Sequence, residues 1–285
     1  MVMSESRVSP PYRLRLLGVR LARLREARGL TGAQVAQQTG FTPSALSRLE
    51  RGKNRYVTPG DVRLLLDLYD GDQKVREECL DLVASARVTP YWAPHRRALG
   101  ELEEYVALET EAQQIRYWHP LLIPGLFQTE AYAHAVISAD WFDHEPSLVR
   151  LKARARLARQ WIVRCDDPVH VHAVIAEGVL RQHVGGPVVM REQLDRLVEE
   201  AARPNVTVQV LPREVGAHPG MAGGFVLLSM PWLGEALFIE AGGGGVLDRG
   251  PRVREYGRLL SRLQALALPG EESAAFIARV AEEIE

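Results

Sequence analysis

Residues 31–55 read TGAQVAQQTGFTPSALSRLERGKNR, which holds two short helical patterns separated by a glycine. Thr31 and Gln34 have the spacing of a capping box, in which each side chain accepts a hydrogen bond from a backbone amide at the start of a helix. Gly40 is expected to end that helix, and Thr42, followed by proline, is expected to start the next one. The stretch therefore predicts two helices joined by a tight turn.

Further helical patterns lie on both sides of this pair. Leucines three and four residues apart predict an amphipathic helix that ends at Gly29, and two more helices are expected over 62–69 and 75–86. Together these patterns predict an all-α domain of five helices over residues 11–87. Its second and third helices have the layout of a helix-turn-helix, in which the later helix enters the major groove of DNA.

The helix that begins after Thr42 has one apolar and one polar side. At about 100° per residue, Leu46 and Leu49 fall on the first side. The second side carries two hydroxyls and two guanidiniums, which come from Ser44, Ser47, Arg48 and Arg51. Such a face can hydrogen-bond to base edges and phosphates. Glu50 on this helix is expected to pair with Arg25 and so to fix two helices against each other.

The net charge of −1 conceals a strong asymmetry along the chain. Residues 1–60 carry eleven Lys and Arg against three Glu, a charge of +8, which leaves −9 for residues 61–285. A basic block on an acidic remainder indicates that one end of the chain meets a polyanion, and the alternative is a charge pattern that serves solubility alone. Combined with the predicted helix-turn-helix, the charge favours double-stranded DNA.

The candidate DNA-binding residues have different expected roles. Arg48 could contact O6 and N7 of guanine, the commonest base-specific contact, whereas Lys53 and Arg55 in the following loop are better placed for phosphates. Gln34 could touch the DNA backbone, although its capping role competes for the side chain. For each arginine the alternative is an ordinary solvated side chain. The full candidate set is Gln34, Thr42, Ser44, Ser47, Arg48, Arg51, Lys53 and Arg55.

Residues 17–53, LGVRLARLREARGLTGAQVAQQTGFTPSALSRLERGK, resemble the Xre-type helix-turn-helix of phage repressors and their bacterial relatives. The matching features are the REARGL lead-in, Val35 with the alanine after it, Gly40 and the SRLERG segment. The resemblance implies a lambda-repressor-like domain. Many relatives carry Gln where this chain has Gly32. The third helix of this chain begins with proline and serine, whereas the corresponding helix of those repressors is Gln-rich. The DNA sequence that is read therefore does not transfer from any known operator.

The rest of the chain resembles the actinobacterial Xre regulators that have a C-terminal domain of unknown function. The segments that carry this second resemblance are 108–137, 171–186, 190–212 and 223–230. Such regulators are described as antitoxin-like, are often encoded beside a small acidic partner protein, and are linked to development and secondary metabolism. The resemblance implies the same of this chain.

A change of pattern separates the two parts of the chain. Residues 88–98, VTPYWAPHRRA, hold two prolines and two aromatic residues and are predicted to be a linker. Beyond it, helices are expected over 99–117, 129–139, 147–162, 189–202, 251–267 and 272–284, and strands over 169–175, 206–211, 224–230 and 235–240. The chain is thus predicted to be α+β, with a mixed helix and sheet domain over residues 99–285 of undetermined topology.

Other residue groups are weaker candidates for chemistry. His170, His172, His183 and His218 with Glu177 lack the HExxH or CxxC spacing of metal sites, which favours solvated or core-edge histidines. The glycines at 242–245 lack a phosphate-binding spacing and are expected to form a flexible loop, and the apolar region Pro124–Tyr132 is typical of core more than of a groove. We therefore expect no catalytic residues, no cofactor, no metal and no enzymatic activity.

Cellular location and partners follow from the same features. Cys79 and Cys165 fit core thiols in a reducing cytoplasm, and the sequence shows neither a signal peptide nor an apolar span of about 20 residues, so no membrane is expected. We expect a cytoplasmic, nucleoid-associated transcriptional regulator, dimeric because one module contacts little DNA, whose C-terminal domain serves dimerisation and partner or effector binding. The alternatives are an antitoxin-like module that binds a small neighbouring-gene protein and autoregulates, and a small-molecule-sensing C-terminal domain.

Overall fold

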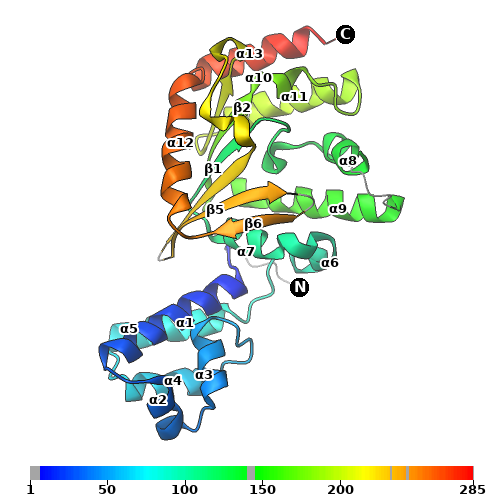
Figure 1. Cartoon of the computed structure of the whole chain (residues 1–285). Coiled ribbons are helices and arrows are strands. Elements are labelled where there is room, and N and C mark those ends of the chain that lie inside the picture. The colour runs from blue at the N-terminus through cyan, green and yellow to red at the C-terminus, as the bar shows by residue number, and fades with distance from the viewer. Residues whose placement is uncertain (1–6, 140–144, 232, 242–243, 285) are drawn as a thin grey trace. The chain divides into compact units, whose positions relative to one another are not determined.

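The computed structural model describes residues 7–139, 145–231, 233–241 and 244–284, and the chain divides into two compact units, residues 1–91 and 92–285 (Figure 1). The first unit is helical in its described residues. Its helices are α1 (Pro10–Ala27), α2 (Gly32–Thr39), α3 (Pro43–Glu50), α4 (Pro59–Leu68) and α5 (Gln73–Ser85). This order confirms the predicted series of five helices.

Side-chain caps determine where these helices begin. Thr31 and Gln34 form the predicted capping box, in which the Gln34 side-chain oxygen accepts from the Thr31 amide at 2.8 Å. Thr42 and Thr58 cap α3 and α4 in the same position, each with a proline as the next residue. Gly40 ends α2 with a φ of +79°, a backbone angle that residues with a Cβ rarely adopt. The turn between α2 and α3 is therefore set by local sequence.

The second unit is built on one six-stranded mixed sheet (Figure 1). The strands are β1 (Gln114–His119), β2 (His170–Ala176), β3 (Val206–Leu211), β4 (Phe225–Met230), β5 (Gly234–Ala241) and β6 (Gly244–Asp248), in the order β3-β2-β1-β4-β5-β6. β1, β2 and β3 are parallel, whereas β4, β5 and β6 pair antiparallel. The predicted α+β class is thus confirmed.

Helices precede the sheet, fill the connections from β1 to β2 and from β2 to β3, and follow β6. They are α6 (Arg96–Leu99), α7 (Glu103–Glu111), α8 (Glu130–Ser138), α9 (Pro146–Ala158), α10 (Glu177–Arg181), α11 (Pro187–Ala201), α12 (Arg252–Leu266) and α13 (Gly270–Glu282). Short 3-10 turns occur at Ala93–His95, Gly100–Leu102, Gly125–Phe127, Arg159–Val163, Arg213–Val215 and Pro219–Ala222. Predicted strands and helices beyond residue 128 agree with these bounds within a few residues.

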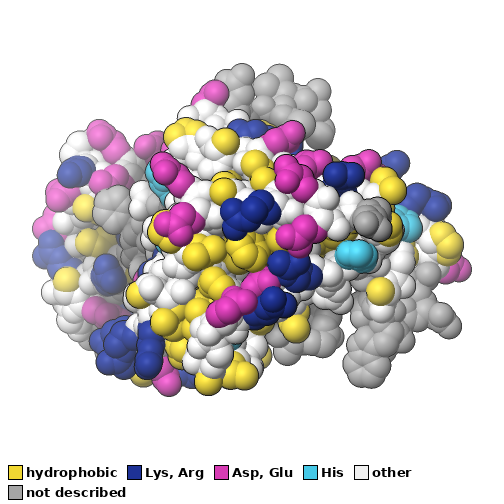
Figure 2. All heavy atoms as spheres, turned by 90° about the horizontal axis from the view of Figure 1, so that it is seen from above, with side chains coloured by type: hydrophobic (Ala, Val, Ile, Leu, Met, Phe, Trp, Pro, Cys, Tyr) yellow, Lys and Arg dark blue, Asp and Glu magenta, His cyan; other side chains and the backbone are white. Residues whose placement is uncertain are grey.

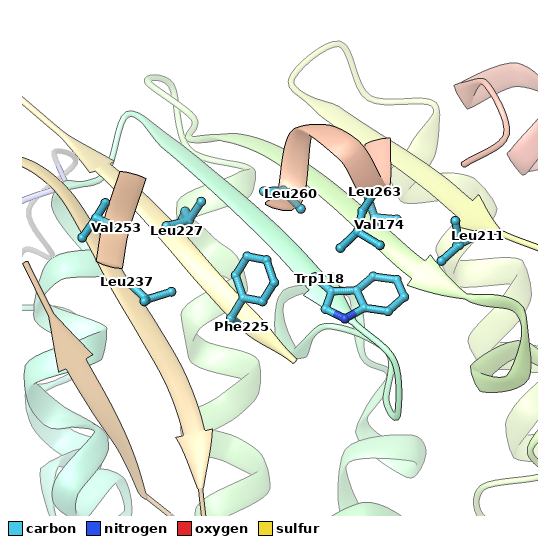
Figure 3. Packing of buried hydrophobic residues seen from close by; sticks show 9 residues of the cluster. All are labelled: Trp118, Val174, Leu211, Phe225, Leu227, Leu237, Val253, Leu260 and Leu263. Carbon is cyan, nitrogen blue, oxygen red and sulfur yellow. The ribbon is translucent and has the colours of Figure 1, made fainter. Parts of the chain in front are cut away.

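The core lies on both faces of the sheet. On one face, Leu260 and Leu263 of α12 belong to the same buried cluster as Trp118, Phe225 and Leu227 of the central strands (Figure 3). On the other face, Tyr117 of β1 turns toward α7 and donates a hydrogen bond to Glu109. Successive residues of a strand point to opposite faces of the sheet. Since both Tyr117 and Trp118 are buried, β1 is covered on its two sides.

Two predictions about local structure need correction. The helix expected over 99–117 is wrong at its end, because α7 stops at Glu111 and β1 begins at Gln114. Residues 114–119 pair in register with β2, and 114–118 pair with β4, so this segment is a strand of the sheet. The described part of the predicted glycine loop belongs to β6, since Gly244 and Gly245 pair with β5, while residues 242–243 lie outside the described residues.

The packing of β6 on β5 explains the glycine at 245. A Cβ on Gly245 would lie 2.2 Å from the Phe238 ring, so this strand position requires glycine.

The predicted linker 88–98 is folded from residue 92 onward. Trp92 is 1% exposed, and Ala93–His95 and the start of α6 are helical. The prolines and aromatic residues there belong to a short folded segment.

Candidate nucleic-acid interface

The apolar side of α3 anchors this helix in the first unit. Leu46 and Leu49 are each 2% exposed, as their predicted position requires. The four polar side chains of the opposite side are all exposed; they are Ser44, Ser47, Arg48 and Arg51. The helix therefore presents two hydroxyls and two guanidiniums to solvent.

Two glycines allow α1 and the end of α3 to approach closely. A Cβ on Gly18 of α1 would lie 2.5 Å from the backbone oxygens of Leu49 and Glu50. A Cβ on Gly52, just after α3, would lie 2.4 Å from the Cα of Arg15. Gly52 also has a φ of +69°, where glycine is favoured. Backbone contact of this kind leaves little freedom in the angle between the two helices.

The predicted pair of Arg25 and Glu50 is confirmed and joins the same two helices. Arg25 donates from Nε to one Glu50 oxygen at 2.6 Å and from Nη2 to the other at 3.1 Å. Its Nη1 donates to the backbone oxygen of Leu30 at 2.8 Å. The hydrogen bond to Glu50 raises the pKa of Arg25 above its ordinary value. A two-point contact between partly buried charges holds α3 at a fixed rotation on α1.

Some arginines of this unit are paired with carboxylates, and those around α3 are not. Arg20, Arg28 and Arg76 form ion pairs with Glu78, Asp70 and Asp67. In the part of the chain that the structure describes, no carboxylate pairs with the four cations of the α3 region, which are Arg48, Arg51, Lys53 and Arg55. Positive charge is therefore left uncompensated along one exposed helix and the loop after it.

Within that region, local hydrogen bonds orient the guanidiniums. Arg48 donates to the Ser44 hydroxyl at 3.3 Å, and Arg51 donates from Nε to the backbone oxygen of Ser47 at 3.1 Å. Both contacts run along the helix surface, so each guanidinium keeps further N–H donors on the exposed side. The arrangement fits a side chain that can meet a base edge or a phosphate oxygen.

The loop after α3 adds an aromatic residue that the sequence prediction missed. Tyr56 is 90% exposed, and its backbone amide donates to the Asn54 side chain at 3.1 Å. The next residue, Val57, is 4% exposed and fixes the loop to the core. A tyrosine hydroxyl is a common donor to DNA phosphates, and its place beside Lys53 and Arg55 is the signal that could have identified it.

Gln34 and Thr42 have structural roles in addition to their predicted ones. The Gln34 side-chain oxygen accepts from the Thr31 amide, and the Thr42 hydroxyl accepts from the Ala45 amide at 3.1 Å. Both side chains are exposed at the first turns of α2 and α3. Their contacts with DNA stay predictions, since these hydrogen bonds alone account for the residue types.

Among the weaker candidates of the second unit, His172 has structural contacts, whereas His170 and His183 are exposed. His172 lies between the side chains of Gln209 and Gln264, at 2.7 and 3.0 Å, and burial lowers its pKa. Among the described residues, no group of three His, Cys, Asp or Glu could hold a metal ion. The apolar region is core as expected, because Leu126, Phe127 and Tyr132 are fully buried.

Charge is distributed differently over the second unit. Several acidic side chains there are paired with arginines, as with Glu200, which contacts Arg196 and Arg203 around one buried carboxylate. On the face that Figure 2 shows, the described Lys and Arg side chains are interspersed with Asp and Glu. None of the helices in the described ranges is long and apolar enough to cross a membrane.

Comparison with known families divides the chain in the same way. Residues 16–79 match a family described as Helix-turn-helix domain, and residues 102–279 match one described as Domain of unknown function (DUF5753). The second match spans more than half of the chain. A search of curated proteins and a search of solved structures gave no match. The helix-turn-helix match includes α2, α3 and the uncompensated cations described above.

Proposed function

The chain belongs to the family with the Domain of unknown function (DUF5753), and we propose that it is a sequence-specific transcriptional regulator that binds double-stranded DNA through α3. The observation that carries this proposal is the exposed Ser and Arg face of α3, whose cations have no carboxylate partner among the described residues. DNA phosphates would supply the missing negative charge.

Different residues of this surface would contribute affinity and specificity. Arg48 lies within the exposed helix and is suited to two hydrogen bonds with guanine. Lys53, Arg55 and Tyr56 lie in the loop, where contacts with phosphates position the helix without reading sequence. The contacts of α3 with α1 keep the reading helix rigid, so that its side chains enter the groove in one orientation.

We further propose that the domain is of the Xre, lambda-repressor-like type and acts as a dimer on paired half-sites. The order of five short helices, with the tight turn between the second and third, supports the type. A single module contacts a small area of DNA, and two copies about one helical turn apart would increase affinity and selectivity. The second unit would supply the contact between the copies.

An antitoxin-like role with a small acidic partner is the second candidate. One observation favours an acidic partner: α12 carries exposed arginines at Arg254, Arg258 and Arg262, spaced one turn apart on one side of the helix. Co-purification of the full chain with the product of a neighbouring gene tests this role. Loss of that complex in the triple Ala variant of these arginines would support it, and an unchanged complex would count against this surface.

We propose that the protein has no enzymatic activity and works on the nucleoid in the cytoplasm. The buried carboxylates that could act in catalysis hold ion pairs instead: Glu109 with Arg159, and Glu177 with Arg181. Such pairs are typical of structural positions, in which a buried carboxylate has its hydrogen bonds satisfied.

Selection from a random duplex library with the purified full chain, followed by sequencing, tests the proposed function. A regulator of this kind enriches a short motif with inverted half-sites, and its affinity falls steeply as salt is raised. Recovery of DNA without any enriched motif at moderate salt would rule out sequence-specific binding. The Arg150→Ala variant, which removes an exposed arginine of the second unit, is a control and should enrich the same motif as the parent chain.

A further inference from the structure

An apolar hollow lies at the carboxyl end of β1 in the second unit. β1 pairs in parallel with β2 on one side and antiparallel with β4 on the other, and Trp118 pairs with Phe225 at the start of β4 (Figure 3). The chain leaves β1 after His119 and passes through an apolar segment before α8. In open sheets, ligand sites form beyond the carboxyl ends of parallel strands.

The lining of this hollow is apolar apart from one imidazole. The hollow encloses about 640 Å³, including its open mouth, which is within the usual range of small-molecule sites. Its walls come from two segments, the residues that follow β1 and those around the start of β4. None of the described lining residues is Asp, Glu, Lys or Arg; they are His119, Pro120, Leu121, Leu122, Gly224, Phe225 and Val226.

Close packing of the two segments holds the walls in place. A Cβ on Gly224 would lie 3.1 Å from Cδ of Pro120 and from the backbone oxygen of Trp118, so glycine allows the segments to approach. Trp118 donates from Nε1 to the backbone oxygen of Gly220 at 2.8 Å, which fixes the residues before Gly224 to β1 as well. These contacts indicate a hollow that is formed before any ligand arrives.

His119 is the polar side chain of the hollow. It is half-buried, and neither of its ring nitrogens makes a hydrogen bond within the described residues. Burial, followed by the charges of Arg159 and Arg156, lowers the pKa of His119 to about 4, so its imidazole is neutral near pH 7. A neutral imidazole has one donor and one acceptor, and a hydroxyl group can pair with either.

The two arginines nearby line a neighbouring polar hollow that shares His119, and the protein engages both. Arg159 donates from Nε and Nη2 to the two oxygens of the buried Glu109, at 2.8 and 2.6 Å. Arg156 donates from Nη1 to the Gln128 side-chain oxygen at 3.0 Å. Neither arginine lines the apolar hollow. An anion placed there would lose its hydration without a cation to replace it.

The size of the hollow favours a small molecule over a macromolecule. Leu121 is 71% exposed at the hollow, so a ligand would cover apolar surface that water now contacts. Seven described residues line the hollow, whereas a stable protein interface takes about 20–30 residues from each partner. An uncharged molecule with one polar group therefore complements the lining in size and in chemistry.

We propose that this hollow binds an uncharged small molecule with an apolar body, whose hydroxyl or carbonyl group meets His119 and whose body lies along Leu121 and Val226. The proposal concerns the second unit alone and does not depend on DNA binding. Binding of such a molecule would make this unit a sensor of neutral, apolar metabolites.

Calorimetric titration of the full chain with 1-octanol, with octanoate as the charged control, tests the proposal. Octanol is expected to saturate one site with a Kd below about 1 mM and to bind at least about tenfold more tightly than octanoate, whose carboxylate would lose its hydration. Each methylene group added between 1-hexanol and 1-octanol should tighten binding by about fourfold, the gain from burying one such group. Tighter or equal binding of octanoate, or no saturable binding of octanol, would overturn the proposal.

A matched pair of exposed apolar residues locates the bound molecule. Leu121→Ser should weaken octanol binding by about fivefold or more, whereas Val188→Ser at the start of α11 should leave it within about twofold. Both side chains are 71% exposed in the parent chain, so neither change disturbs the core. An unchanged affinity in Leu121→Ser, or equal weakening by the two variants, would overturn the proposal.

Replacement of His119 by phenylalanine tests the polar contact, because it keeps a ring and removes both nitrogens. His119→Phe should bind octanol about fivefold more weakly, whereas His183→Phe, which changes an exposed histidine, should stay within about twofold of the parent. In an NMR titration, octanol should shift the ring signals of His119 and leave those of His183 unchanged. An unchanged affinity in His119→Phe would overturn the assignment of the polar group to this residue.

Sedimentation velocity distinguishes a small ligand from a second copy of the chain. The parent and Leu121→Ser are expected to sediment alike, because seven residues are too few for a stable interface. Loss of a dimer in Leu121→Ser but not in Val188→Ser would show that a second copy fills the hollow, and this result would overturn the proposal.

Discussion

Replacement of Glu50 by glutamine should loosen the contact between α1 and α3 while it keeps the shape of the side chain. Arg25 and Glu50 have side chains 15% and 16% exposed and share two hydrogen bonds of 2.6 and 3.1 Å. Breaking a buried pair costs about 3–5 kcal/mol, and an exposed pair contributes about 0.2–1 kcal/mol. The intermediate exposure of this pair gives a loss of about 2 kcal/mol, which corresponds to about a 30-fold change in an equilibrium constant.

Hydrogen exchange of the full chain, followed by mass spectrometry, measures this loss locally. Peptides from α1 and α3 should exchange about 30-fold faster in Glu50→Gln, because local opening exposes their amides. Asp70→Asn provides a control, since Asp70 pairs with Arg28 on the surface with side chains 80% and 45% exposed. That variant is expected to change exchange less than about threefold.

A double-mutant cycle with Arg25→Met completes the experiment. If the two residues act through their mutual contact, the double variant loses less stability than the sum of the single variants, with a coupling of about 1–2 kcal/mol. Additive losses, with a coupling below about 0.3 kcal/mol, would refute the view that this pair fixes α3 on α1.

Three further predictions concern packing, thiol chemistry and pH. Gly18→Ala should destabilise the packing of α1 on α3 by about 1–3 kcal/mol, because the added methyl group meets backbone oxygens at 2.5 Å. Gly257→Ala in α12, where nothing lies within 4 Å of the added methyl group, should be neutral or stabilising. Thermal unfolding and hydrogen exchange distinguish the two variants. Burial raises the pKa of Cys79 to about 11, so a thiol reagent at pH 8 should label the partly exposed Cys165 first. In Cys165→Ser only Cys79 remains, and rapid labelling of that variant would contradict this. The pKa of His119 is about 4 in the folded chain against 6.5 in an unfolded one, so its contribution to stability is present above pH 6.5 and is lost as the pH falls toward 4. In thermal unfolding followed by tryptophan fluorescence, His119→Gln should therefore lose less stability than the parent between pH 6.5 and 4. An equal loss of stability in that variant would contradict this.

Local signals in the sequence were sufficient to predict the first unit. Capping residues, the glycine after α2 and the spacing of the leucines act within one or two helical turns, so they can be identified without knowledge of the fold. The pair of Arg25 and Glu50 was predictable because the charge of Glu50 is out of place on a basic helix. The close approach at Gly18 was not predictable, since it depends on which helix packs against it.

The second unit shows where sequence patterns lose their information. β1 is central and covered on both faces, so its residues Ile115, Tyr117 and Trp118 give no simple alternation, and the preceding helix hides its start. β6 was missed because its first two residues are glycines, whose role becomes visible only beside Phe238 of β5. The exposure of Tyr56 depends equally on tertiary structure.

The selection experiment repeated with two variants tests the central claim, that the exposed face of α3 reads DNA, most directly. Arg48→Ala is expected to return a motif with relaxed preference at one or more guanine positions, at a cost of about 1–3 kcal/mol for the original site. Lys53→Ala is expected to return the parental motif with uniformly weaker binding and a shallower dependence on salt. If both variants returned the parental motif with the parental affinity, α3 would not be the element that reads DNA.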